Sequence, residues 1–273
     1  MAVFFLWGKT RVKTKRENYI CKKNRMSNKE VVFGIHGIKE ALKNEDSQIE
    51  SIWLSKNNKS KEYHGIIDLA KEQNIKVSFV PPQKFRKYAH LNHQECIAFV
   101  SPISYADLEE EVEKSLENSN TARFLLLDGV TDVRNLGAII RTAEATGIAC
   151  VIIPINNSAP INNETVKTSS GAVYNLPIVR VNHLLDAVYY LQASGIKVLT
   201  ASEKASKTIY ETSVEKGPLA LVMGDEGKGI SKQVLKAADN SIKLPMLGKT
   251  GSLNVSVACG VILYELLRRN LED

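Results

Sequence analysis

The downstream half of the chain is constrained most by six short apolar segments that alternate with helical patterns. The segments are residues 124–127, 150–153, 178–181, 198–201, 219–223 and 242–244. Each is apolar on both faces, which predicts an α/β fold with a mostly parallel sheet covered by helices on both sides. Ligands of such sheets bind in the loops that follow the carboxyl ends of the strands. We therefore expect the functional residues in those loops.

Upstream of this sheet, the sequence predicts a smaller α/β domain of residues 29–104. Helices and strands are expected to alternate there, at residues 37–42, 49–54, 61–73, 75–80 and 97–100. Residues 105–121 are acidic and predict a linker helix. The larger domain is then expected to cover residues 122–273.

Residues 1–28 form a Lys/Arg-rich tail, for which we expect disorder. Its charges follow its apolar run, which is the reverse of a secretory signal. A transit peptide, a basic arm that touches RNA and a true start at Met26 are the alternatives for this tail.

The net charge of +6 is concentrated in that tail, because residues 1–25 hold eight Lys/Arg and one acid, and the remainder of the chain sums to about −1. The chain without its tail is therefore not a basic protein. A local excess of Lys and Arg remains between Lys56 and Lys87. It is either a solvated helix face or a surface that contacts phosphates.

The cysteines give no sign of a metal site. Cys21, Cys96, Cys150 and Cys259 lie far apart, without CxxC spacing. Three of them lie in apolar runs and are expected to be buried thiols, which fits a reducing compartment, the cytoplasm. The longest uncharged stretch near the carboxyl terminus, residues 252–264, is shorter than the about 20 residues that cross a bilayer.

Three loop segments carry the polar residues of interest. They are residues 135–143 (NLGAIIRTA), 223–230 (MGDEGKGI) and 244–256 (LPMLGKTGSLNVS). None has the GxGxxG order of a dinucleotide site, and Lys243 stands where a phosphate-binding loop needs glycine. Asn135 and Ser252 are also candidate caps for helices at residues 136–147 and after 252, and capping alone would explain them.

Together these segments resemble the SpoU/TrmH class of 2′-O-ribose RNA methyltransferases, in the SPOUT superfamily. Residues 32–38 (VFGIHGI) also resemble the start of the L30e-like RNA-binding domain found in the branch that methylates a guanosine of 23S ribosomal RNA. The resemblance covers nearly everything after Met26. It implies a deep trefoil knot in the larger domain, a homodimer and no metal.

The resemblance also implies a cofactor and roles for the site residues. S-adenosylmethionine would be bound by five residues: Gly224, Leu244, Met246, Ser252 and Leu253. Four residues are implied as catalytic: Arg141, Asn135, Glu226 and Asn254. The family assigns proton removal to the arginine at Arg141. A guanidinium is normally never deprotonated, so a fixed cation that stabilises the developing alkoxide is the physical alternative.

The sequence leaves two rival functions open. One is the same methyl transfer on transfer RNA, or on a site that confers antibiotic resistance. The other is a non-catalytic RNA-binding or ribosome-assembly factor on the same fold. The complete set of Asn135, Arg141, Glu226 and Asn254 favours an enzyme, and the upstream domain favours ribosomal RNA.

Overall fold

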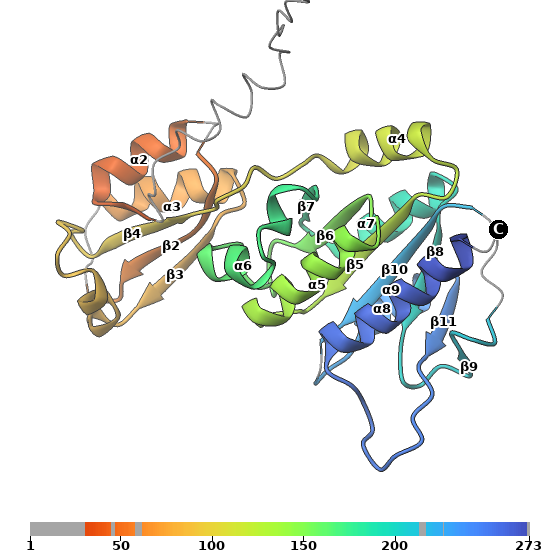
Figure 1. The fold of residues 1–273 in the computed structure, drawn as a ribbon. Helices are drawn as coiled ribbons and strands as arrows, with labels where there is room; N and C mark the ends of the chain where they lie inside the picture. The colour runs from red at the N-terminus through yellow and green to blue at the C-terminus, as the bar shows by residue number, and fades with distance from the viewer. Residues whose placement is uncertain (1–30, 45–46, 58–61, 213–216, 226, 272–273) are drawn as a thin grey trace, which may run out of the picture.

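The structure is a computed structural model that describes residues 31–44, 47–57, 62–212, 217–225 and 227–271. These residues form two lobes, each built on its own sheet (Figure 1). The tail predicted for residues 1–28 lies outside the described residues, as do Cys21 and Glu226.

The small lobe is a four-stranded mixed sheet with two helices on one face. Its strand order is β1-β4-β2-β3, and only β2 and β3 run parallel. The two helices bury Ile38 and Ile66 against Ile52, while Phe85 of a short 3-10 segment packs on the opposite face. The elements are β1 (Val31–Phe33), α2 (Ile35–Lys43), β2 (Ile49–Ser55), α3 (Glu62–Glu72), β3 (Lys76–Val80), η1 (Pro82–Tyr88) and β4 (Cys96–Val100).

The large lobe is a seven-stranded sheet of order β7-β6-β5-β10-β8-β11-β9, in which every adjacent pair is parallel. The predicted parallel sheet is therefore confirmed. Its strands are β5 (Arg123–Asp128), β6 (Cys150–Pro154), β7 (Ile178–Val181), β8 (Lys197–Ala201), β9 (Lys207–Thr208), β10 (Leu219–Gly224) and β11 (Asn240–Lys243). Its helical elements are α4 (Leu108–Asn118), α5 (Val133–Ala145), α6 (Asn163–Thr168), η2 (Ala172–Tyr174), α7 (Leu184–Ala193), α8 (Lys232–Ala237) and α9 (Val255–Leu271).

Two hydrophobic cores cover the two faces of this sheet. Along β5, Leu125 and Leu127 belong to the core with α5 and α9, whereas Phe124 and Leu126 belong to the core with α4, α7 and α8. Successive strand residues point to opposite faces, so a strand between two helical layers must be apolar throughout. This alternation explains the continuous apolar runs of the sequence.

Helix α4 packs on the large lobe. Val112 is fully buried in its second core, and Ala106 forms a parallel bridge with Val179 of β7. Asp107 caps the helix, because its carboxylate accepts the N–H groups of Glu109 and Glu110.

One buried ionic cluster joins the two lobes. Glu50 of β2 pairs with Arg180 of β7 at 3.1 Å and accepts the backbone N–H of Ile161. Tyr105 donates its hydroxyl to Glu50, and the Arg180 guanidinium lies 4.7 Å from the centre of the Tyr105 ring. Burial raises the pKa of Glu50, while Arg180 acts in the opposite direction. The paired charges fix the small lobe against the carboxyl end of β7.

The predicted strands of the large lobe are all present, with ends shifted by at most two residues. Cys96, Cys150 and Cys259 are buried free thiols, as predicted, and burial raises the pKa of each to about 12. Among the helices that the structure describes, none combines the length and apolar character needed to cross a membrane.

Candidate functional site

The three loop segments meet at the carboxyl edge of the large sheet. Segment 135–143 is part of α5, which follows β5. Segment 223–230 contains the end of β10 and the turn after it. Segment 244–256 contains the connection from β11 and the start of α9. Strands β5 and β10 are adjacent, and their last residues, Asp128 and Gly224, are paired in register. The site is therefore built where the topology predicts ligand loops.

The turn after β10 folds back tightly on itself. The Asp225 carboxylate accepts the N–H groups of Gly227 and Lys228, and its carbonyl accepts the N–H of Gly229. A Cβ added at Gly224 would lie 2.4 Å from the carbonyl carbon of Gly229. Position 224 therefore excludes any side chain. Glu226, predicted as catalytic, lies outside the described residues.

Helix α5 begins earlier than predicted. It starts at Val133 because Asp132 is its N-cap and accepts the N–H groups of Arg134 and Asn135. Asn135 is therefore not the cap of α5, and its side chain is half-buried in the first turn. Gly137 permits close packing below it, since a Cβ there would lie 1.8 Å from the Thr168 hydroxyl oxygen of α6.

Asn254 connects two of the segments. Its side-chain amide donates to the Asn135 side-chain oxygen at 3.0 Å, although the two residues are 119 positions apart. Its own oxygen accepts the N–H groups of Ser256 at 3.0 Å and Val257 at 3.4 Å. The N-cap of α9 is thus Asn254, and the expectation that Ser252 fills this position is wrong. One side chain both starts α9 and fixes the first turn of α5.

Arg141 lies on the exposed side of α5, six residues beyond Asn135, or about 9 Å along the helix axis. Within the described part of the chain its side chain has no hydrogen bond or ion pair. Arg134, one heptad earlier on the same side, is also exposed and lies 3.7 Å from Glu164. The structure thus brings Asn135 and Asn254 together, while Arg141 lies exposed further along α5.

The other four predicted cofactor residues lie in or beside the loop before α9. Leu244 is half-buried against the core, whereas Met246, Ser252 and Leu253 are exposed. No backbone N–H of residues 246–253 donates a hydrogen bond within the described part of the chain. Polar backbone without a protein partner must bind solvent or a ligand.

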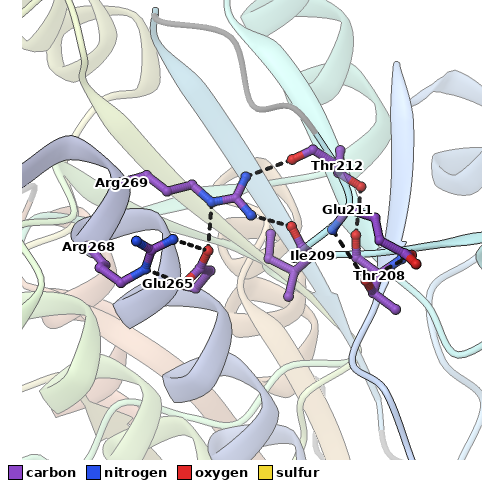
Figure 2. A network of polar contacts seen from close by, with 7 residues as sticks. All are labelled: Thr208, Ile209, Glu211, Thr212, Glu265, Arg268 and Arg269. Carbon is purple, nitrogen blue, oxygen red and sulfur yellow. Dashed lines mark hydrogen bonds and ion pairs between the residues drawn. The ribbon is translucent and has the colours of Figure 1, made fainter. Parts of the chain in front are cut away.

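A polar network that the sequence analysis missed anchors the other end of α9 (Figure 2). Glu265 accepts from Arg268 at 2.9 and 3.0 Å and from Arg269 at 2.7 Å. Arg269 also donates to the carbonyls of Thr212 and Ile209, in the segment after β9. These arginines hold the pKa of Glu265 down at about 2. An acid in an apolar helix followed by arginines at i+3 and i+4 was the available signal.

Comparisons with known proteins identify the two lobes. Residues 122–264 match the model of the SpoU rRNA methylase family. Residues 31–106 match the model of the RNA 2′-O ribose methyltransferase substrate-binding domain.

Relatives match along most of the chain. A 23S rRNA (guanosine-2′-O-)-methyltransferase of Pseudomonas aeruginosa is 38% identical over 245 residues, covering 89% of this chain and 98% of that protein. A Staphylococcus haemolyticus protein named for the TrmH family of tRNA/rRNA methyltransferases is 35% identical and covers 88% of this chain and 95% of its own. Among solved structures, the AdoMet-bound rRNA methyltransferase of Sinorhizobium meliloti superposes with a TM-score of 0.57 at 24% identity, covering 95% of this chain and 97% of that chain.

Proposed function

Because this chain belongs to the SpoU rRNA methylase family, we propose that it transfers a methyl group from S-adenosylmethionine to a ribose 2′-hydroxyl of RNA. The observation that carries the proposal is the Asn135–Asn254 hydrogen bond at the carboxyl edge of the large sheet. It joins two of the family's three segments at the point where ligands of parallel sheets bind. We propose a guanosine of 23S ribosomal RNA as the substrate, which the Pseudomonas aeruginosa relative supports.

The residues around the loop before α9 fit S-adenosylmethionine. Gly224 offers backbone with no side chain, and residues 246–253 offer free N–H groups to the polar edges of an adenosine. In this proposal Leu244, Met246 and Leu253 supply apolar contacts to the cofactor, and Ser252 lies beside them in the sequence of the same loop. The cofactor supplies an electrophilic methyl group when it is bound, so the reaction requires no metal.

The protein must hold the 2′-hydroxyl in line with that methyl group and stabilise the oxygen as it loses its proton. We assign the second task to Arg141, as a fixed cation rather than a base. Asn254 and Asn135 position each other through their hydrogen bond, and Glu226 completes the proposed set. The trefoil knot stays a prediction, as do the individual roles.

A homodimer is part of the proposal. Leu253, Val257, Val261, Tyr264 and Leu271 are all at least 38% exposed and recur at helical spacing along one side of α9. A second copy of the same helix would cover this apolar stripe. The stripe begins at Leu253 in the proposed cofactor loop, so the dimer interface would adjoin the site. We place the dimer in the cytoplasm, with the three buried thiols reduced.

Two measurements on the full chain test this function. Titration calorimetry should detect micromolar binding of S-adenosylmethionine, and incubation with 23S ribosomal RNA should produce one 2′-O-methylated nucleotide. No cofactor binding by a folded protein would instead identify an RNA-binding factor, and methylation of transfer RNA alone would reassign the substrate.

Arg141→Ala should abolish methyl transfer and leave cofactor affinity within a few-fold. Arg134→Ala is the matched control, because it removes an exposed arginine from the same side of α5. Methylation that persists in Arg141→Ala would refute the role given to this residue.

A further inference from the structure

The sheet face of the small lobe opposite α2 and α3 carries an aromatic cluster. Trp53, Tyr88 and Phe99 pack there beside the small core around Phe85, and all three remain partly accessible. The Trp53 and Phe99 rings meet edge to face, with centroids 4.7 Å apart, and Tyr88 lies 6.1 Å from Phe99. We call Trp53, Tyr88 and Phe99 the aromatic face.

Exposed lysines border this face. Lys84 lies over the Trp53 ring, with Nζ 5.3 Å from its centroid, and Lys87 lies 5.8 Å from that of Tyr88. Both belong to the basic run between Lys56 and Lys87 that the sequence left without a role. Lys71 of the same run lies on α3, which covers the other face of the sheet. The run is therefore divided between two faces, and Lys84 and Lys87 place cations against the rings of the aromatic face.

Trp53 of the aromatic face also lines a cleft between the lobes. Trp53 and Lys76 line its small-lobe side, and the loop at residues 155–160 lines the other. Arg180, which also lines it, is neutralised by Glu50, so Lys76 is the exposed cation of its wall. The cleft therefore combines a ring surface with positive charge.

The loop at residues 155–160 also borders the candidate active site. Its Ala159 donates a backbone hydrogen bond to Val130, between β5 and α5, at 2.8 Å. A Cβ added at Gly129 would lie 3.3 Å from the Asn157 side-chain nitrogen and 3.4 Å from the Asp225 Cβ. One loop thus separates the cleft from the turn after β10, so a single strand of RNA could occupy both places.

We propose that the aromatic face and this cleft bind a single-stranded segment of the RNA next to the methylated nucleotide, with an unpaired base stacked on Trp53. Lys76, Lys84 and Lys87 contact its phosphates. Aromatic rings flanked by cations are the surface that binds unpaired bases, whereas an acidic protein would need only the cations. The proposal rests on the proposed function, because it places the substrate of that reaction.

Fluorescence tests the binding directly. In a Trp7→Phe variant Trp53 is the only tryptophan. A single-stranded RNA of eight nucleotides should quench its emission, and an abasic strand of equal length should quench it much less. Lys84→Ala/Lys87→Ala should weaken RNA binding about tenfold and lower the salt dependence by about 0.7 per lysine in the logarithmic slope. Lys71→Ala, the matched control, should stay within twofold of the parent.

Equal loss in the Lys71→Ala control, or unchanged binding in the double variant, would overturn the proposal. Quenching by polyglutamate as strong as by RNA would overturn it in favour of an acidic protein ligand. Titration of the same preparations with the cofactor distinguishes a failure of this RNA-binding proposal from a failure of the proposed function. The double variant should bind S-adenosylmethionine normally and methylate ribosomal RNA with a raised KM, whereas a failed function would abolish cofactor binding in the parent as well.

Discussion

Replacing Glu265 by Gln should destabilise the protein in a way that depends on pH. The carboxylate is 9% exposed and accepts hydrogen bonds from Arg268 and Arg269, and Arg269 in turn binds the carbonyls of Ile209 and Thr212 (Figure 2). The Gln side chain has nearly the same shape as Glu, but it is neutral and has one acceptor oxygen instead of two. It would leave Arg269 with one fewer anionic partner while that side chain still holds the segment after β9.

The pKa of Glu265 gives the size of the expected loss in unfolding free energy. It falls from 4.5 to about 2, because Arg268 first and Arg269 second hydrogen-bond the carboxylate. That difference corresponds to at most about 3.4 kcal/mol at pH 7. The Arg268 side chain is 52% exposed, so solvent screening reduces the expected loss to about 2 kcal/mol.

The sign of the pH dependence follows from the direction of this pKa. A lowered pKa stabilises the folded state fully above about pH 4.5, and this contribution is lost as the pH falls toward 2. At pH 3 the same relation leaves roughly 40% of the effect. The difference between the parent protein and Glu265→Gln should therefore shrink to below about 1 kcal/mol at pH 3.

Urea unfolding of the full chain at pH 7 and pH 3, at one fixed protein concentration, measures both differences. Glu40→Gln is the control, because Glu40 also pairs with a cation three residues away but is 73% exposed. It should change the free energy of unfolding far less. Equal losses for Glu265→Gln at the two pH values would refute the electrostatic account of the network.

Three further results are expected. Asn254→Asp should keep the cap of α9, and hence nearly all stability, but lose the hydrogen bond donated to Asn135 and most methyl transfer. Asn254→Ala should lose methyl transfer and also about 1 kcal/mol of unfolding free energy, measured by urea unfolding. Equal methylation by both variants and the parent protein would contradict this prediction. Gly137→Ala should lower the free energy of unfolding by about 1–3 kcal/mol through its clash with Thr168, and Thr168→Ala should restore part of it; a neutral single variant would show that α6 simply shifts. Cys150 and Cys259, whose pKa burial raises to about 12, should escape alkylation by iodoacetamide at pH 8 until the protein unfolds, as peptide mass analysis would show.

Local patterns predicted the regular elements, because burial between two helical layers requires strands that are apolar throughout. Strands β1 and β9 were not predicted, because strands of three and two residues are too short to show a hydrophobic pattern. The sequence analysis places the start of this helix at Leu136, whereas α5 begins at Val133 because Asp132 is its N-cap. Caps are chosen by backbone geometry at the helix end, and several polar residues near each end compete for the role.

Local sequence patterns do not predict contacts between residues that are far apart in the chain. The pair of Glu50 and Arg180 joins strands of different lobes, and nothing in either local segment indicates the other. Helix α4 packs on the large lobe through buried Val112 and partly buried Leu108 and Leu116, but its many acidic residues indicate a linker by composition alone. The family resemblance placed Asn135 and Asn254 in one site, but nothing in the sequence predicted the hydrogen bond between them.

Helix α9 ties the stability of the large lobe to the geometry of the site. Asn254 fixes its first turn to α5, and Arg269 fixes its last turns to the segment after β9. Asn270 accepts a hydrogen bond from Arg123 at the opposite end of the sheet from the site. The loop before α9 is therefore held at its end by Asn254, while the N–H groups of residues 246–253 stay free of protein partners in the described chain. In the proposed function, this arrangement lets the backbone of residues 246–253 bind the cofactor while the hydrogen bond between Asn135 and Asn254 stays in place.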